Sequence, residues 1–155
     1  MKNILVPTDF SACAANAIDA AYQLARKFGS TVHLLHIITD ARTSANEQEW
    51  NQAIENANVL LGKISKEQPD VETVPLTATG KLVKVLEQYV SAHGIDLVVM
   101  GSHGASGKQE YFIGSNTQKA VRSIFANVLI IKDKLENVNF DKVVFASNFN
   151  QTERD

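Results

Sequence analysis

The sequence predicts one α/β domain built on an open parallel sheet with helices on both faces. Five short apolar segments recur along the chain, and several lack polar alternation, as parallel strands covered on both faces do. Amphipathic segments with helical spacing separate them, and repeated strand–helix alternation implies right-handed crossovers and a doubly wound sheet. A chain of 155 residues with 45% hydrophobic residues is long enough for one such core.

The expected elements follow from the positions of these segments. The strands are the apolar runs Ile4–Val6, Val32–Ile38, Val71–Leu76, Leu97–Met100 and Val128–Ile131. The helices carry one apolar face each, from Ala14 to Phe28, Trp50 to Ile64, Leu82 to His93 and Thr117 to Ile124. Ser11 is a suitable N-cap for the first helix, and Gly29 and Gly94 are suitable C-caps for the first and third.

Composition excludes several classes of protein. The formal net charge is -2 and the pI is about 6.1, which argues against a broad nucleic-acid-binding face. Cys13 is the one cysteine, so an intrachain disulfide or a paired-cysteine metal site is impossible. The sequence has neither the pattern of a signal peptide nor an apolar stretch of about 18 residues for a membrane span. We therefore expect a cytoplasmic protein that binds neither nucleic acid nor membrane.

A spaced set of glycines follows the fourth expected strand. Gly101-Ser102-His103-Gly104 is followed, after nine residues, by Gly114-Ser115 at the start of the fourth helix. Glycine lets backbone N–H groups approach phosphate oxygens closely, and a helix N-terminus adds unpaired amides and a favourable dipole. Gly101 or Gly107 alone is better explained as a turn residue. The whole set, between a buried strand and a helix, predicts phosphate binding.

Two other phosphate-binding motifs are absent. No Gly-x-Gly-x-x-Gly follows any expected strand, so the dinucleotide fingerprint is missing. Gly107-Lys108 is similar to part of a P-loop, but Ser102 occupies the position of its first glycine and Gln109 that of its Ser or Thr. The chain is therefore not a P-loop protein.

The segment after the first strand is the second place where a ligand is expected. In doubly wound sheets, ligands bind beyond the carboxyl ends of strands where connections diverge, here after Pro7-Thr8-Asp9 and after Gly101. Asp9 is a candidate ligand, although Asp is also common in turns and at helix starts. Pro7 shapes the exit from the strand.

Together these motifs resemble a universal stress protein domain over about residues 2–133. The matching segments are Ile4 to Ser11, Leu34 to Ile37, Val99 to Gly104, Gly114-Ser115 and Val128 to Lys132. The Gly-x2-Gly-x9-Gly-Ser spacing is similar to the ATP-binding branch of that family. The resemblance implies a Rossmann-like sheet with strand order 3-2-1-4-5, a dimer paired through the fifth strand, and a role in the stress response. Asn127 departs from the proline that the family often has there.

The resemblance also implies a site. Asp9 would contact the adenine or ribose, the backbone of Ile37 would lie beside the base, and Gly101 would lie near the ribose. The phosphates would be held by Gly104, Gly114 and Ser115. The full set of expected nucleotide-binding residues is Pro7, Asp9, Ile37, Gly101, His103, Gly104, Gly114 and Ser115. The ligand would be ATP, with Mg²⁺ or Mn²⁺; no catalytic residue or protein metal site is expected.

Other polar or aromatic residues have a structural and a functional interpretation. His36 lies in an apolar strand and is expected to be a satisfied core histidine. His103 could contact phosphate or face solvent, and Lys108 is a further candidate phosphate partner. Cys13 is close to a helix N-terminus, where a thiolate is stabilised, but it is expected to be a small buried residue. Trp50 is expected in the core.

The C-terminal segment is similar to the N-terminal one. Residues 141–150 repeat the pattern of residues 2–11, with Ser147 at the place of Thr8, Asn148 at that of Asp9 and Phe149 at that of Phe10. We expect a domain over residues 1–135, then a linker and the first strand of a truncated second copy over 136–155. The chain would thus be the N-terminal half of a tandem protein. An unrelated edge strand is the alternative.

Three functions are compatible with these patterns. The first is a regulatory nucleotide-binding protein that holds ATP. The second is a slow ATPase, although the sequence has no Walker lysine and no evident base constellation. The third is a dimerisation module that binds no nucleotide.

In the intact tandem protein the fifth strand, Val128–Ile131, is expected to pair with its counterpart in the second copy. The isolated piece is expected to self-associate through the same edge as a homo-oligomer, because an exposed apolar edge strand favours pairing.

Overall fold

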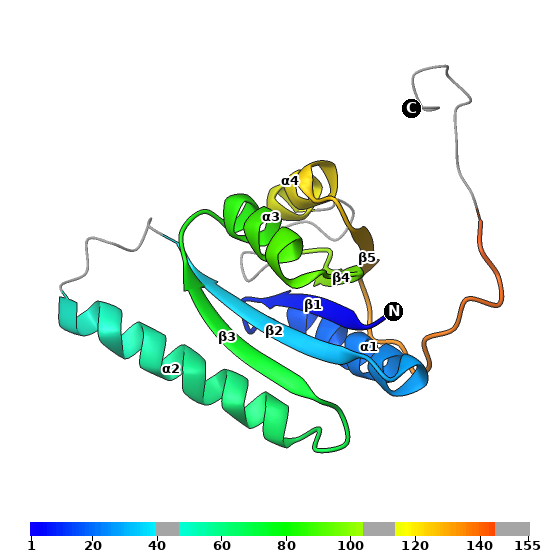
Figure 1. Ribbon diagram of the computed structural model, residues 1–155, viewed down its shortest axis with the longest axis horizontal. Coiled ribbons are helices and arrows are strands. Elements are labelled where there is room, and N and C mark those ends of the chain that lie inside the picture. The colour runs from blue at the N-terminus through cyan, green and yellow to red at the C-terminus, as the bar shows by residue number, and fades with distance from the viewer. Residues whose placement is uncertain (40–46, 104–113, 145–155) are drawn as a thin grey trace.

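The computed structural model describes residues 1–39, 47–103 and 114–144, in which strands and helices alternate (Figure 1). The elements are β1 (Asn3–Thr8), α1 (Ala12–Phe28), β2 (Thr31–Ile38), α2 (Glu47–Lys66), β3 (Thr73–Thr79), α3 (Leu82–His93), β4 (Leu97–Gly101), α4 (Ser115–Ser123) and β5 (Asn127–Ile131). None of the described helices is long and apolar enough to cross a bilayer.

The five strands form one parallel sheet in the order β3-β2-β1-β4-β5. This confirms the predicted fold class and strand order. The centre of the sheet is β1, in which Ile4, Leu5 and Val6 are fully buried. β3 is an outer strand, and it is there that Pro75, which cannot donate a backbone hydrogen bond, is accommodated.

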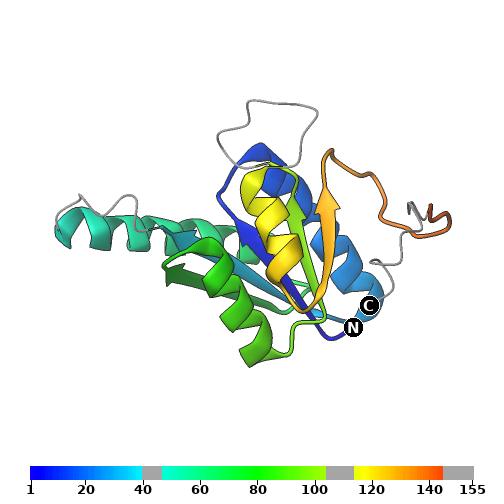
Figure 2. The ribbon, with the colours of Figure 1, turned by 90° about the horizontal axis from the view of Figure 1, so that it is seen from above.

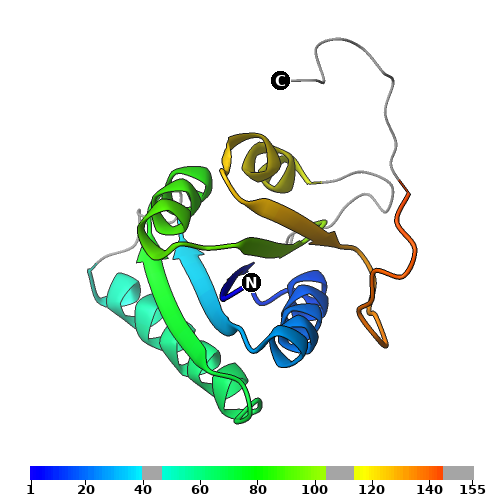
Figure 3. The same ribbon diagram turned by 45° about the vertical axis from the view of Figure 1, so that its right-hand side comes forward.

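The helices cover both faces of the sheet (Figures 2 and 3). α1 and α2 lie on one face and α3 and α4 on the other, as right-handed crossovers require when the chain reverses direction across the sheet. Each face has its own buried cluster. Leu34 and Leu61 belong to the α1–α2 side, and Leu35 and Leu86 belong to the α3–α4 side. Adjacent residues of β2 thus enter opposite cores, which explains why the strand lacks polar alternation.

Local chemistry sets the helix ends, as predicted. The Ser11 Oγ accepts a hydrogen bond from Ala14 N–H at 3.2 Å and caps α1. Gly29 and Gly94 follow α1 and α3 with φ of +63° and +57°, the left-handed conformation that glycine adopts without strain.

α2 differs from its prediction. It begins at Glu47, three residues before Trp50, and only Ala57 and Leu61 are buried on it. Trp50 is half-buried and Leu60 is 43% exposed, so the predicted apolar face is wider than the buried one. The reason is the position of α2 over the outer strand β3 (Figure 1). The sheet ends at β3 and therefore covers only part of the helix.

The third strand also differs from its prediction. It begins at Thr73, not at Val71, and extends to Thr79 because Thr73–Thr79 pair with Val32–Ile38. Val71 is nevertheless buried, in the cluster on the α1–α2 side. Its apolar character reflects burial in a loop, which sequence alone does not distinguish from burial in a strand.

Beyond β5 the chain turns back over α1. Val138 is 7% exposed and belongs to the core cluster on the α1–α2 side. Gln23 on α1 fixes this segment, because its Oε1 accepts from Val138 N–H at 2.8 Å and its Nε2 donates to the Leu135 carbonyl at 3.1 Å. Val143 and Val144, in the segment similar to β1, are largely exposed, and positions 145–150 of that segment lie outside the described residues.

Candidate nucleotide site

The candidate site lies at the carboxyl ends of β1 and β4. α1 follows β1 on one face of the sheet and α4 follows β4 on the other, so the chain connections diverge between these neighbouring strands. This is the topological switch point at which doubly wound sheets bind ligands. Two segments that are distant in the sequence, Thr8–Ser11 and Gly101–His103, leave the sheet there.

Pro7 explains why β1 and β4 separate before their ends. β1 pairs with β2 from Asn3 to Thr8, but its register with β4 stops at Leu5. The Lys2 carbonyl accepts from Thr31 on the β2 side and the Asn3 carbonyl from Asp96 on the β4 side, so odd-numbered positions face β4. Pro7 therefore faces β4 without an N–H to donate, and the ladder cannot continue there.

Gly101 is the last residue of β4 and is covered by α1. A β-carbon at this position would lie 2.9 Å from the Cys13 Sγ and 3.1 Å from the carbonyl carbon and oxygen of Cys13. Glycine is therefore required for the close approach of the first turn of α1 to β4. Cys13 was expected to be a small buried residue; it is half-buried and packs against this glycine.

Ser102 joins four elements and was not among the predicted site residues. Its N–H donates to the Ile131 carbonyl at 2.9 Å and its carbonyl accepts from Gly114 N–H at 2.8 Å. Its buried hydroxyl lies 2.6 Å from His103 Nδ1 and 3.7 Å from the Cys13 Sγ. A small hydroxyl residue after a strand gives no signal of such a role in sequence, because its partners are remote along the chain.

The first turn of α4 is held against the end of β4. The buried hydroxyl of Thr117 donates to the Gly101 carbonyl at 3.1 Å, and the contact of Gly114 with Ser102 fixes the residue before the helix. Gly114 is the N-cap and has no side chain with which to cap the helix. The amides of Ser115, Asn116 and Thr117 have no intrahelical acceptors and carry the positive end of the helix dipole. Ser115 is exposed beside them.

Asp9 lies in the turn between β1 and α1. Its side chain is exposed, and its Oδ1 accepts from Ser11 N–H at 3.0 Å. The carboxylate thus makes the turn contact that the structural interpretation of Asp9 predicts. It also stands beyond the end of β1, where a ligand at the switch point would meet it.

Ile37 and His36 lie on β2, next to β1, and the other remaining predicted residues are not described by the structure. Ile37 is half-buried against the cluster on the α3–α4 side. His36 is half-buried and its Nδ1 donates to the Thr8 carbonyl at 2.8 Å, so it is satisfied, as expected, at the border of the core. Gly104 and Lys108 fall outside the described residues.

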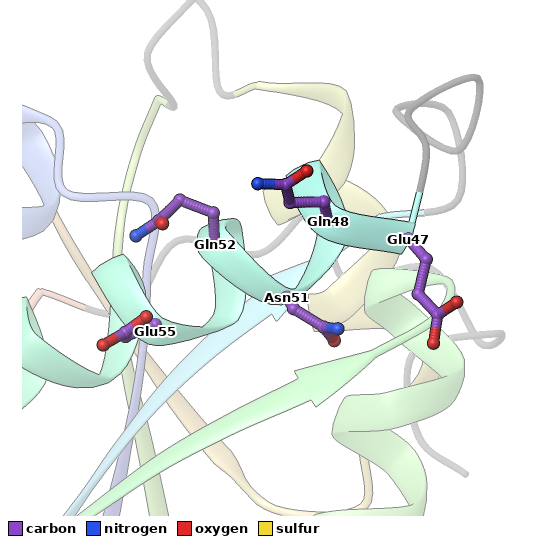
Figure 4. Close-up of a pocket in the computed structure, with 5 residues that line it drawn as sticks. All are labelled: Glu47, Gln48, Asn51, Gln52 and Glu55. Atoms are coloured by element: carbon purple, nitrogen blue, oxygen red, sulfur yellow. The ribbon is translucent and has the colours of Figure 1, made fainter.

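The surface hollow that Figure 4 shows is not a better candidate. It is lined by Glu47, Gln48, Asn51, Gln52 and Glu55 of α2. Its two carboxylates would repel a phosphate, and none of the predicted site residues lines it. In the described ranges, moreover, no three His, Cys, Asp or Glu side chains are grouped as a metal site would need.

Two ionisable groups of the described residues, Asp96 and His33, have shifted pKa values at the opposite, amino-terminal end of the sheet. The pKa of Asp96 is lowered because its carboxylate accepts hydrogen bonds from the N–H groups of Asn3 and Lys2, at 3.0 and 2.6 Å. Burial lowers the pKa of His33, which is close to the start of β2.

Comparison with known proteins identifies the family. The universal stress protein family model matches residues 1–132. The chain belongs to the universal stress protein family. It is 28% identical over 159 residues to a universal stress protein of Methanocaldococcus jannaschii, a match that covers 86% of this chain and 96% of that one. A solved structure of that protein superposes with a TM-score of 0.78 over 87% of this chain and 98% of its own.

Two further solved universal stress proteins share the fold at lower identity. One, solved in complex with cAMP, is 20% identical with a TM-score of 0.64 over 84% of this chain and 96% of its own. The other, from Archaeoglobus fulgidus and in complex with dAMP, is 18% identical with a TM-score of 0.63 over 85% of this chain and 98% of its own. These two structures show that the fold of this universal stress protein is kept at low sequence identity.

Proposed function

We propose that this universal stress protein binds ATP at the switch point and acts as a nucleotide-dependent regulatory protein of the stress response. The observation that carries the proposal is the first turn of α4. It is held to β4 by Thr117 and Gly114, its amides lack intrahelical acceptors, and its Ser115 hydroxyl is exposed. The complexes of two family members with cAMP and dAMP support an adenine nucleotide as the ligand.

The proposed roles follow from the positions of the residues. Ser115 and the amides after Gly114 would hold phosphate oxygens, and Gly104 would add a backbone donor. Asp9 would accept hydrogen bonds from the ribose or adenine, with the backbone of Ile37 beside the base. Gly101 and Pro7 act through shape, because Gly101 admits α1 and Pro7 ends the pairing of β1 with β4.

A divalent cation fits this site only as part of the ligand. Mg²⁺ is commonly held by phosphate oxygens together with one or two carboxylates or hydroxyls, so it needs no cluster of protein ligands. The described residues provide such donors in Asp9 and Ser115. Mg²⁺ or Mn²⁺ would neutralise charge on the phosphates, and the protein groups would orient them.

Titration calorimetry with ATP and magnesium tests the proposal. Ser115→Ala should weaken ATP binding by about tenfold, as expected for loss of a hydrogen bond to a charged group. Ser123→Ala at the other end of α4 is the matched control and should bind like the natural protein. Absence of heat with ATP, AMP and cAMP at millimolar concentration would overturn the proposal.

We further propose that β5 pairs between chains. β5 is an outer strand of the sheet, with Val128, Leu129 and Ile130 only half-buried, and Phe125 before it is fully exposed. An apolar outer strand favours pairing with another chain. Sedimentation velocity should show a dimer that Leu129→Lys converts to a monomer, whereas a natural protein that is monomeric at high concentration would contradict the pairing.

The tail motivates a proposal about chain organisation. Residues 141–150 repeat the pattern of 2–11, and we propose that they begin a second copy whose fifth strand is the natural partner of β5. A longer chain that contains the second copy should then be a monomer in the same sedimentation experiment. A longer chain that still dimerises through β5 would exclude this arrangement.

A further inference from the structure

The turn that carries Asp9 contains a strained residue. Phe10 has a φ of +62°, in the left-handed region, and no other non-glycine residue within the described ranges has a positive φ. A bulky side chain rarely adopts this conformation, and it persists only where surrounding contacts hold it. Phe10 stands between Asp9 and Ser11, the N-cap of α1.

Phe10 packs against the core cluster on the α1–α2 side, and its ring also meets His36 on the neighbouring strand β2. The two rings are stacked, with their centroids 4.6 Å apart and their planes inclined by 27°. The same imidazole donates from Nδ1 to the Thr8 carbonyl at 2.8 Å. Because a carbonyl oxygen can only accept, Nδ1 carries the hydrogen. One side chain therefore holds the backbone before Asp9 and the ring after it.

Hydrogen bonds inside the turn transmit this constraint to the carboxylate. Phe10 N–H donates to the Thr8 hydroxyl at 3.0 Å, and Ser11 N–H donates to Asp9 Oδ1 at 3.0 Å. The second bond depends on the direction in which the chain leaves Phe10, because φ at Phe10 turns the following peptide back towards Asp9. The orientation of the Asp9 carboxylate is therefore coupled to the stacked pair.

We propose that Phe10 and His36 are positioning residues for Asp9, holding its carboxylate in the orientation that receives the sugar or base of the nucleotide. This inference rests on the proposed function. Glycine at position 10 would adopt the turn without strain, so phenylalanine is explained by the contacts of its ring, with the core cluster and with His36, and not by the turn alone. Preorganisation of this kind raises affinity by removing the ordering cost from the binding step.

Four variants test the backbone strain at Phe10, the stacking of the two rings and the hydrogen bond of His36. Phe10→Gly removes both the strain and the stack, and Phe10→Tyr keeps the ring and should restore the natural behaviour. His36→Asn keeps a nitrogen donor close to the place of Nδ1 without the ring, and His36→Leu removes the donor and the stack. We expect Phe10→Gly and His36→Leu to weaken binding of ATP with magnesium by about tenfold, and His36→Asn by less.

Two readouts distinguish positioning from a general loss of stability. Exchange of the Ser11 amide with deuterium should become several-fold faster in Phe10→Gly and His36→Leu, with or without nucleotide. Val138→Ala, in the core and distant from the turn, is the destabilised control and should bind ATP normally. Unchanged Ser11 exchange in both variants, or an affinity loss no larger than that of Val138→Ala, would overturn the inference. If the natural protein binds no nucleotide, the proposed function fails, and the Ser11 exchange rates still decide whether the pair holds the turn.

Discussion

Cys13 occupies the space that a side chain on Gly101 would need. A β-carbon at position 101 would lie 2.9 Å from the Cys13 Sγ, closer than such atoms normally approach. The thiol also lies 3.6 Å from the Ile131 carbonyl and 3.7 Å from the Ser102 hydroxyl. Gly101, the last residue of β4 and part of the glycine set that predicts phosphate binding, is thus also required for packing α1 onto the sheet.

Gly101→Ala should destabilise the protein by about 1–3 kcal/mol, the usual cost of overpacking a closely packed site. In the double variant with Cys13→Ala, part of this loss should be recovered, since the sulfur is gone. Recovery should be incomplete because the backbone carbonyl of Cys13 stays 3.1 Å from the added carbon. A double-mutant cycle of urea unfolding measures the coupling, and strictly additive effects would contradict the contact.

Gly62 provides the opposite case. It lies in the interior of α2, and a β-carbon there would meet nothing within 4 Å. Gly62→Ala should raise the free energy of unfolding by about 0.5–1 kcal/mol, because glycine is the poorer helix former. Urea unfolding checks the sign. A loss of stability would contradict the open space that surrounds this position.

The features that the sequence predicts depend on residues close together in the chain, whereas those that it misses depend on contacts between distant residues. Strand order, the Ser11 cap and the two glycine caps depend on local pattern or on the family resemblance, and they are confirmed. The hydroxyl of Ser102 meets the thiol of Cys13 across 89 positions, and no local pattern encodes that contact. The αL conformation of Phe10 is similarly hidden, because phenylalanine has little propensity for it and its ring partner His36 is 26 positions away.

A substitution at Val138 tests whether the folded domain extends beyond residue 135. We expected the domain to stop at residue 135, yet Val138 packs in the core cluster on the α1–α2 side and is joined to Gln23. Val138→Ala removes two buried carbon atoms and should cost about 1–2 kcal/mol. Exposed Val143→Ala is the matched control and should leave the unfolding midpoint unchanged. Equal midpoints for both variants would place the boundary before Val138.

A group of aromatic and histidine side chains at the amino-terminal end of the sheet should make stability depend on pH. His33 is buried, with Nδ1 2.9 Å from the Tyr89 hydroxyl and Nε2 3.5 Å from the Asn3 Oδ1. Tyr89 in turn stacks on His93, with ring centroids 3.9 Å apart. Burial, and then the charge of His93, lower the pKa of His33, and the carboxylate of Glu72 opposes them.

The sign of the effect follows from that direction. Because the folded-state pKa lies below the unfolded value of about 6.5, the unfolded chain takes up a proton first as the pH falls. Stability is therefore fully present above about pH 6.5, decreases as the pH falls through the window down to the folded pKa, and is constant below it with respect to this group. His33→Gln, which keeps polar atoms for Tyr89, should flatten the profile of unfolding free energy between about pH 8 and pH 5. His93→Gln should only make it shallower, since burial, the larger cause, remains. A profile that is as steep in His33→Gln as in the natural protein would assign the pH dependence to other groups.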